Sequence, residues 1–133
     1  MFLKNQLFSV LILFLLLDFS ISAQVGSEKH GVDFVADTAI LRSDMQRIMD
    51  YGYRNYKNPD VLDSVAYFIK NKFKTLTDSV TEQVYNVNGK DYRNIIASFN
   101  ANKNERLIIG AHYDVYGDQD GADDNGSAVV GLI

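Results

Sequence analysis

A short apolar run that ends in a polar cluster constrains this 133-residue chain more than any other feature. The run spans residues 107–111 (Leu-Ile-Ile-Gly-Ala) and is apolar on both faces, which predicts a central strand of a covered sheet. His112 and Asp114 follow the run at once, and Asp124 follows after a glycine-containing loop. Because α/β folds gather their sites at the carboxyl ends of strands, we expect these three side chains to share a site.

The acidic residues of the chain are concentrated around this cluster. From Leu107 to Ile133 there are five aspartates and no lysine or arginine. Crowded carboxylates are unfavourable unless a positive charge offsets them, and a divalent cation is the simplest candidate. The formal net charge of -4 also argues against nucleic acid as a partner.

The three residues have the chemistry of a metal site. In a strand-like His-x-Asp segment both side chains lie on one side, so Asp114 can accept a hydrogen bond from the ring nitrogen of His112 that does not bind metal. The Asp124 carboxylate has two oxygens and can bridge two metal ions about 3.5–4 Å apart. We therefore expect His112 and Asp124 as metal ligands and Asp114 as the acidic residue that orients His112.

The amino terminus predicts export. Residues 1–23 combine a positive charge at Lys4, an apolar stretch over residues 7–17 and small residues before a cleavage site after Ala23. This pattern is typical of a secretory signal peptide, with a membrane anchor as the alternative, although the stretch is short for spanning a bilayer. The chain has no cysteine, which favours a bacterial secreted or periplasmic protein without stable membrane association.

Residues 24–36 have little periodicity and are expected to form an irregular arm. A capping box at residues 43–46 predicts the start of a first helix. A second helix is predicted to begin at Pro59, with Asn58 as its cap. Its apolar stripe comprises Val61, Leu62, Val65, Phe68, Ile69 and Phe73.

The pattern then changes to strands. Residues 80–87 and 92–99 flank Asn88-Gly89, a strong hairpin signal. Residues 106–111 predict a third strand, and residues 127–133 a further helix. This order predicts an α/β domain over residues 37–133, a three-layer α/β/α sandwich with a mixed sheet that is incomplete in this chain.

Residues 107–114, followed by residues 121–127, resemble the first metal-binding signature of the M28 family of zinc aminopeptidases. Residues 94–97 resemble the strand that precedes it. The resemblance implies a phosphorylase/hydrolase-like fold, hydrolysis of N-terminal peptide bonds of a peptide or protein substrate, and two zinc ions. It further implies that His112 binds one zinc, Asp124 bridges both and Asp114 polarises His112, while Asn125 and Gly126 form a tight turn of unusual peptide geometry.

The family also needs a Glu-Glu pair, another carboxylate ligand and a second histidine, and none of these has a position in this chain. His30, the only other histidine, precedes the domain. We therefore expect the chain to be the N-terminal portion of such an enzyme, truncated before the Glu-Glu pair and inactive alone. Two alternatives are a glutaminyl-cyclase-like zinc acyltransferase and a non-catalytic binding module on the same fold.

Overall fold

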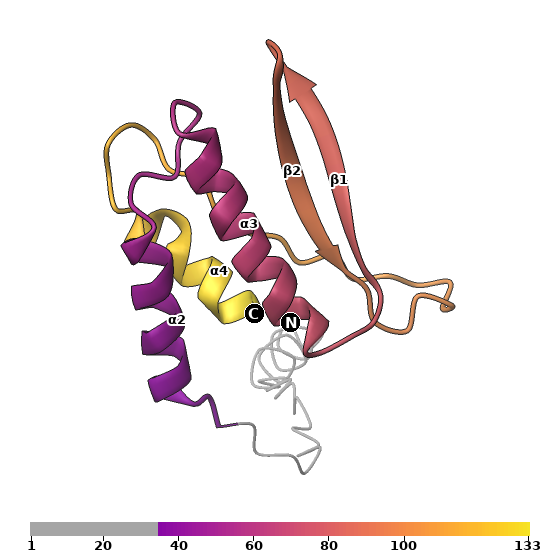
Figure 1. The fold of residues 1–133 in the computed structure, drawn as a ribbon. Coiled ribbons are helices and arrows are strands. Elements are labelled where there is room, and N and C mark those ends of the chain that lie inside the picture. Colours follow the sequence, from indigo (N-terminus) through magenta and orange to yellow (C-terminus); the bar gives the residue numbers. More distant parts are fainter. Residues whose placement is uncertain (1–34) are drawn as a thin grey trace, which may run out of the picture. The chain divides into compact units, whose positions relative to one another are not determined.

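The computed structural model describes residues 35–133. The predicted signal peptide, most of the predicted arm and His30 lie outside these residues. The described part contains α2 (Thr38–Asp50), α3 (Pro59–Lys74), β1 (Val80–Val87), β2 (Lys90–Ala97), the short turn η1 (Ala122–Gly126) and α4 (Ser127–Leu132). Within this part, α3 lies between the β1–β2 hairpin on one side and the helices α2 and α4 on the other (Figure 1).

Helix α2 begins earlier than the sequence pattern suggested. Asp37 is its cap, and its carboxylate accepts hydrogen bonds from the backbone N–H groups of Ala39 and Ile40 at 2.9 and 3.2 Å. The capping box predicted at Ser43 is therefore wrong, since Ser43 lies inside the helix. The Asp37 carboxylate binds free N–H groups in the first turn of the helix, six residues before Ser43. The helix therefore does not need a cap at Ser43.

Helix α3 begins at Pro59 as predicted, because the missing N–H of proline costs nothing at the first helical position. The Asn58 side chain does not cap it; its amide donates instead to the carbonyl oxygen of Tyr53 at 3.0 Å. The predicted stripe is confirmed as the face turned to the core, with Val61 and Phe68 half-buried. The core itself joins α2, α3 and α4 through Ile48, Val65, Ile69, Phe73, Val129 and Val130.

The hairpin is confirmed with its turn. Strands β1 and β2 are antiparallel, in a register that pairs Val80 with Ala97 and Val87 with Lys90. Asn88 and Gly89 both have positive φ, 53° and 80°, which is the backbone of a two-residue hairpin turn. Strand β2 begins directly after the turn, at Lys90, so it starts and ends two residues earlier than the predicted range 92–99.

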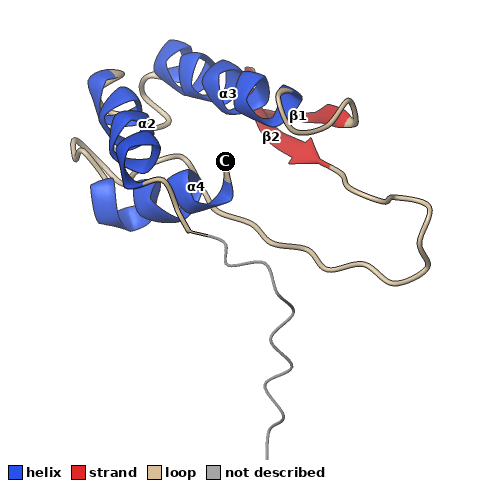
Figure 2. Cartoon of the chain, turned by 90° about the horizontal axis from the view of Figure 1, so that it is seen from below, coloured by secondary structure: helices blue, strands red, loops and turns tan. Residues whose placement is uncertain are grey.

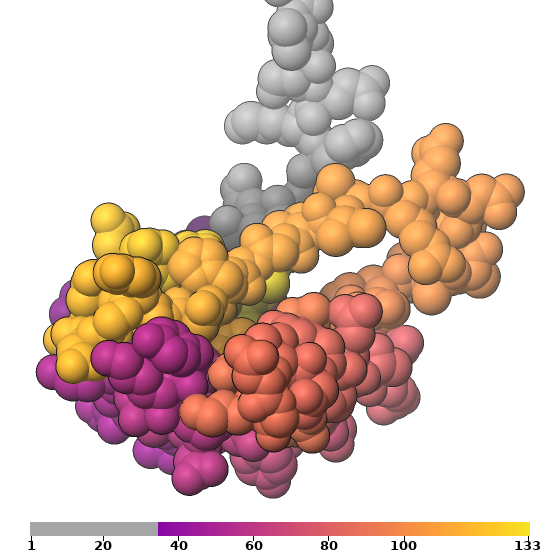
Figure 3. All heavy atoms as spheres, turned by 90° about the horizontal axis from the view of Figure 1, so that it is seen from above, coloured from indigo at the N-terminus to yellow at the C-terminus, as the bar shows by residue number. Residues whose placement is uncertain are grey.

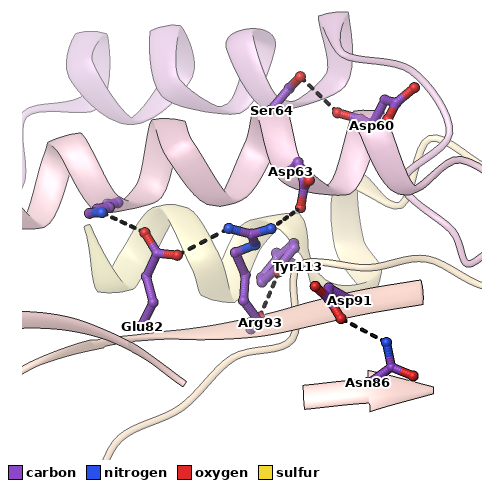
Figure 4. Close-up of polar contacts among 9 residues, drawn as sticks. Asp60, Asp63, Ser64, Glu82, Asn86, Asp91, Arg93 and Tyr113 are labelled. Carbon is purple, nitrogen blue, oxygen red and sulfur yellow. Dashed lines mark hydrogen bonds and ion pairs between the residues drawn. The ribbon is translucent and has the colours of Figure 1, made fainter. Parts of the chain in front are cut away.

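Charged side chains tie α3 to the hairpin. Glu82 on β1 accepts from Lys70 on α3 and from Arg93 on β2, and Arg93 also pairs with Asp63 at 2.9 Å (Figure 4). A separate ion pair, 2.6 Å long, joins Lys72 on α3 to Asp44 on α2. Ion pairs of this exposure contribute little individually, but a network also holds the elements in register.

The predicted third strand is wrong. Residues 105–115 form neither helix nor strand, and Leu107, Ile108 and Ile109 are 86%, 89% and 68% exposed. The segment runs as a long open connection between β2 and α4 (Figure 2), and its first part stands away from the body as a narrow orange arm (Figure 3). An apolar run forms a central strand only when neighbours pair and cover it, and within residues 35–133 β1 and β2 pair only with each other.

The described residues thus form a mixed α/β structure whose sheet is a two-stranded antiparallel hairpin. This confirms the α/β class, while the mixed three-layer sandwich stays a prediction. In residues 35–133 we find no helix with the length and apolar character needed to cross a bilayer.

Candidate metal centre

The structure brings His112, Asp114 and Asp124 together. His112 and Asp114 lie in the connection between β2 and α4, and Asp124 lies in η1, directly before α4. The backbone of Asp124 is not helical, with φ -114° and ψ 90°, which interrupts the turn at this carboxylate. The chain therefore folds back so that the Asp124 side chain reaches the imidazole of His112.

The two ring nitrogens of His112 face different neighbours. Nδ1 lies 3.3 Å from Asp114 Oδ1 and 3.1 Å from the Asp114 carbonyl oxygen. Both neighbours are acceptors, so Nδ1 must carry the proton and donate it. In the neutral ring this assigns the lone pair to Nε2, the arrangement found where a carboxylate orients a metal-binding histidine.

Nε2 of His112 lies 3.1 Å from Asp124 Oδ1. A lone pair and a carboxylate oxygen at this distance repel each other unless a cation or a proton lies between them. Two ligands of one tetrahedral zinc, each about 2.1 Å from the metal, are about 3.4 Å apart. The pair therefore fits two ligands of one zinc ion, and it equally fits a protonated imidazole bonded to a carboxylate.

These residues do not by themselves form a complete metal site. The side chains of His112, Asp114 and Asp124 are 53%, 64% and 85% exposed. Among residues 35–133 no cluster of three or more His, Cys, Asp or Glu side chains is arranged to hold a metal ion. Since catalytic zinc takes three protein ligands and a water, the roles of these residues as ligands stay a prediction.

The residues beside Asp124 shape the turn. The Asp124–Asn125 peptide bond is cis, in line with the expected unusual geometry after this carboxylate. The carbonyl oxygen of Asp123 accepts from the Ser127 hydroxyl at 3.1 Å, and the N–H of Gly126 donates to the carbonyl of Gly121 at 3.0 Å. Asp123 thus contributes its backbone carbonyl to the turn.

Tyr113 anchors the segment between His112 and Asp114 to the hairpin. Its hydroxyl donates to the carbonyl oxygen of Arg93 at 2.7 Å (Figure 4). Burial raises the pKa of Tyr113 to about 12, so the phenol stays protonated and keeps donating near neutral pH. The flanking side chains His112 and Asp114 are left on the exposed side.

Sequence reasoning gave no role to Arg54 and Asn55, which lie between the two predicted helices. Both are fully buried, and both donate hydrogen bonds to backbone carbonyls of the segment between Tyr113 and Gly121. A buried arginine is rare unless paired, and a single charged residue in a polar turn gives no sign of burial in the sequence.

Comparison with known proteins supports the resemblance. Residues 94–133 match the sequence model of peptidase family M28. The chain is also 36% identical, over 88 residues, to the uncharacterized protein YfbL of Escherichia coli (strain K12). That alignment covers 60% of this chain and 27% of the E. coli protein, so the chain spans about a quarter of the length of this relative. No solved structure matches.

Proposed function

We propose that this chain, whose residues 94–133 carry the M28 peptidase signature, contributes the first half of a zinc site in an exported aminopeptidase. The whole enzyme would hold two zinc ions, with His112 and Asp124 as ligands in this chain, on a three-layer α/β/α sandwich. Its substrate class would be peptides or proteins with a free amino terminus. Bound zinc would supply an activated water and polarise the scissile carbonyl.

One observation carries this proposal: Nε2 of His112 faces Asp124 at 3.1 Å while Nδ1 faces Asp114. In the neutral ring, the two acceptors around Nδ1 select the tautomer whose Nε2 lone pair can bind a cation held between His112 and Asp124. Asp114 would then orient the ring and raise its basicity, without binding metal itself. The excess of carboxylates in this region would also attract the positive amino terminus of a substrate.

Zinc binding tests the proposal at the level of this chain. The sequence has two histidines, so the imidazole ¹⁵N signals of His112 can be assigned by comparison with a His30→Gln variant. Zinc titration of the purified chain is expected to move the Nε2 signal of His112, with weak binding because one ion would find two of three protein ligands. Binding through Nδ1, or no response of His112 at saturating zinc, would contradict the proposed site.

The proposed activity is tested in a longer context. A chimera of the E. coli relative, carrying this chain's residues over the aligned 88, is expected to release N-terminal amino acids from peptides in a chelator-sensitive reaction. Asp124→Asn in the chimera is expected to abolish turnover, whereas Asp123→Asn, one residue away, should preserve it. An active Asp124→Asn chimera would remove this residue from the metal site. Export is tested separately, by N-terminal sequencing for cleavage after Ala23.

A further inference from the structure

The strongest unassigned feature is the side chain of Arg54, which is fully buried in the connection between α2 and α3. Its Nε donates to the carbonyl oxygen of Tyr113 at 2.9 Å, and its Nη2 donates to that of Gly121 at 3.1 Å. Nη1 lies 3.4 Å from the carbonyl of Ile48 on α2. One guanidinium therefore joins a helix end to two points of the loop that bears the candidate metal residues.

The backbone around Arg54 strengthens the same attachment. The carbonyl of Arg54 accepts from the N–H of Val115 at 2.8 Å. The next residue, Asn55, donates from its side-chain amide to the carbonyl of Gly117 at 2.6 Å. Two adjacent buried residues thus hold the loop at four places between Tyr113 and Gly121.

The loop is built to admit this guanidinium. Gly121 has φ +60°, and a Cβ there would lie 2.1 Å from Cγ1 of Val115 and 2.9 Å from Nη2 of Arg54. The Gly121 carbonyl also accepts from Gly126, so the Arg54 bond reaches the turn that carries Asp124. Within residues 35–133 the hydrogen bonds of the Arg54 guanidinium go to backbone carbonyls, while Asp120 and Asp114 act on it through space. Burying an arginine is costly, and these three hydrogen bonds offset part of that cost.

We propose that Arg54 is a positioning residue, which fixes His112 and Asp124 relative to each other by binding the carbonyls of Tyr113 and Gly121. The two carbonyls flank the loop: Tyr113 follows His112 directly, and Gly121 opens the turn that contains Asp124. Lysine cannot replace arginine here, because one ammonium group lacks the planar fork that reaches both carbonyls. The link to zinc rests on the proposed function, while the ordering of the loop does not.

The first test measures loop order without metal. In an Arg54→Lys variant, amide hydrogen exchange at Val115 and Gly126 is expected to rise by about tenfold or more, because the loop opens locally. Exchange at Ile69 in α3 should stay at the wild-type value. Arg42→Lys, the same change on the exposed face of α2, is the matched control and should alter none of these rates. Unchanged exchange at Val115 and Gly126, or an equal rise at Ile69, would overturn the positioning role.

The second test reads the candidate ligands. Zinc affinity, followed by the ¹⁵N signals of His112, is expected to fall by about tenfold in Arg54→Lys, a typical effect of a residue that acts through the ligands. Unchanged zinc affinity would overturn the proposed coupling of Arg54 to the site. If the wild-type chain shows no zinc response at all, the proposed function fails, and the exchange comparison still decides the role of Arg54.

A third measurement keeps the proposal testable should Arg54→Lys fail to fold. In the wild-type chain the Nε–H of Arg54 donates to Tyr113 in a buried site, so its exchange with solvent is expected to be about tenfold or more slower than that of exposed Arg42. Equal exchange of the two Nε–H groups would show that Arg54 is not held as described.

Discussion

The Nε2 atom of His112 and the Oδ1 atom of Asp124 lie 3.1 Å apart, although the two residues occupy separate segments, one in the open connection and one in η1. An exposed imidazole and an exposed carboxylate gain little from a surface ion pair. Their approach is set mainly by the backbone, which is held at Tyr113 and Gly121 on either side of the loop.

Replacing the two aspartates around His112 is expected to have unequal effects on zinc binding. Asp124→Asn removes the negative charge of a proposed ligand and should weaken zinc binding more than Asp114→Asn, whose loss should be of order 10–100-fold. Asp123→Asn provides the control, since Asp123 contributes its backbone to the turn. Calorimetric titration of the three variants with zinc measures the loss of zinc affinity in each and so ranks them. Equal losses for Asp114 and Asp124 would argue against one being a ligand and the other its partner.

The helical core should respond strongly to truncation of Ile48. This side chain is fully buried between α2, α3 and α4, so Ile48→Ala is expected to cost about 2–5 kcal/mol of unfolding free energy. Ile40→Ala makes the same change in the same helix at a position 54% exposed, and should alter stability by about 0.5 kcal/mol or less. Urea denaturation of both variants measures the difference. Similar losses at the two sites would mean that the core is not packed around Ile48.

The elements that could be predicted from the sequence are those with local signals. Pro59 and the apolar stripe of α3 specify a helix whatever surrounds it, and Asn88-Gly89 specify the hairpin turn. The start of α2 was harder, because Asp37 and Ser43 both offer cap chemistry and the contacts of the first turn decide between them.

The predictions that failed concern parts of the chain whose structure depends on residues far away in the sequence. The run at residues 107–111 indicates a preference for burial, but it does not say which neighbours would provide it, and no described element covers it. Arg54 binds backbone carbonyls 59 and 67 residues away in the sequence. Because every residue has a backbone carbonyl, the sequence does not show which ones a side chain will bind. His112 and Asp124 were predicted to share a site because both follow the apolar run and because their spacing resembles a family signature, whose model matches residues 94–133.

Stability should depend on pH through Glu82. Hydrogen bonding from Lys70, aided by Arg93, lowers the pKa of Glu82 below its ordinary value of 4.5. A carboxyl group with a lowered pKa stabilises the fold above its unfolded pKa, and this contribution is lost as pH falls through the folded value. Glu82→Gln should therefore reduce the loss of stability on acidification below 4.5.

Urea midpoints measured from about pH 7 to about pH 3 test this expectation. Glu105→Gln, at an exposed position in the connection after β2, is the matched control and should retain the wild-type dependence. A Glu82→Gln variant that loses stability on acidification as steeply as the wild type would show that the Lys70–Glu82 contact does not persist in solution.

The exposed apolar segment should make the chain self-associate. Leu107, Ile108 and Ile109 stand open to solvent as neighbours in a segment without partner strands, and such a segment favours pairing with another chain. Ile108→Lys is expected to shift the sedimentation profile toward monomer and to reduce the binding of a fluorescent dye that reports exposed apolar surface. The unfolding free energy should change by about 0.5 kcal/mol or less. Leu76→Lys places the same charge at an exposed leucine outside this segment and should leave association unchanged. Association that persists in Ile108→Lys but disappears in Leu76→Lys would assign it to another surface.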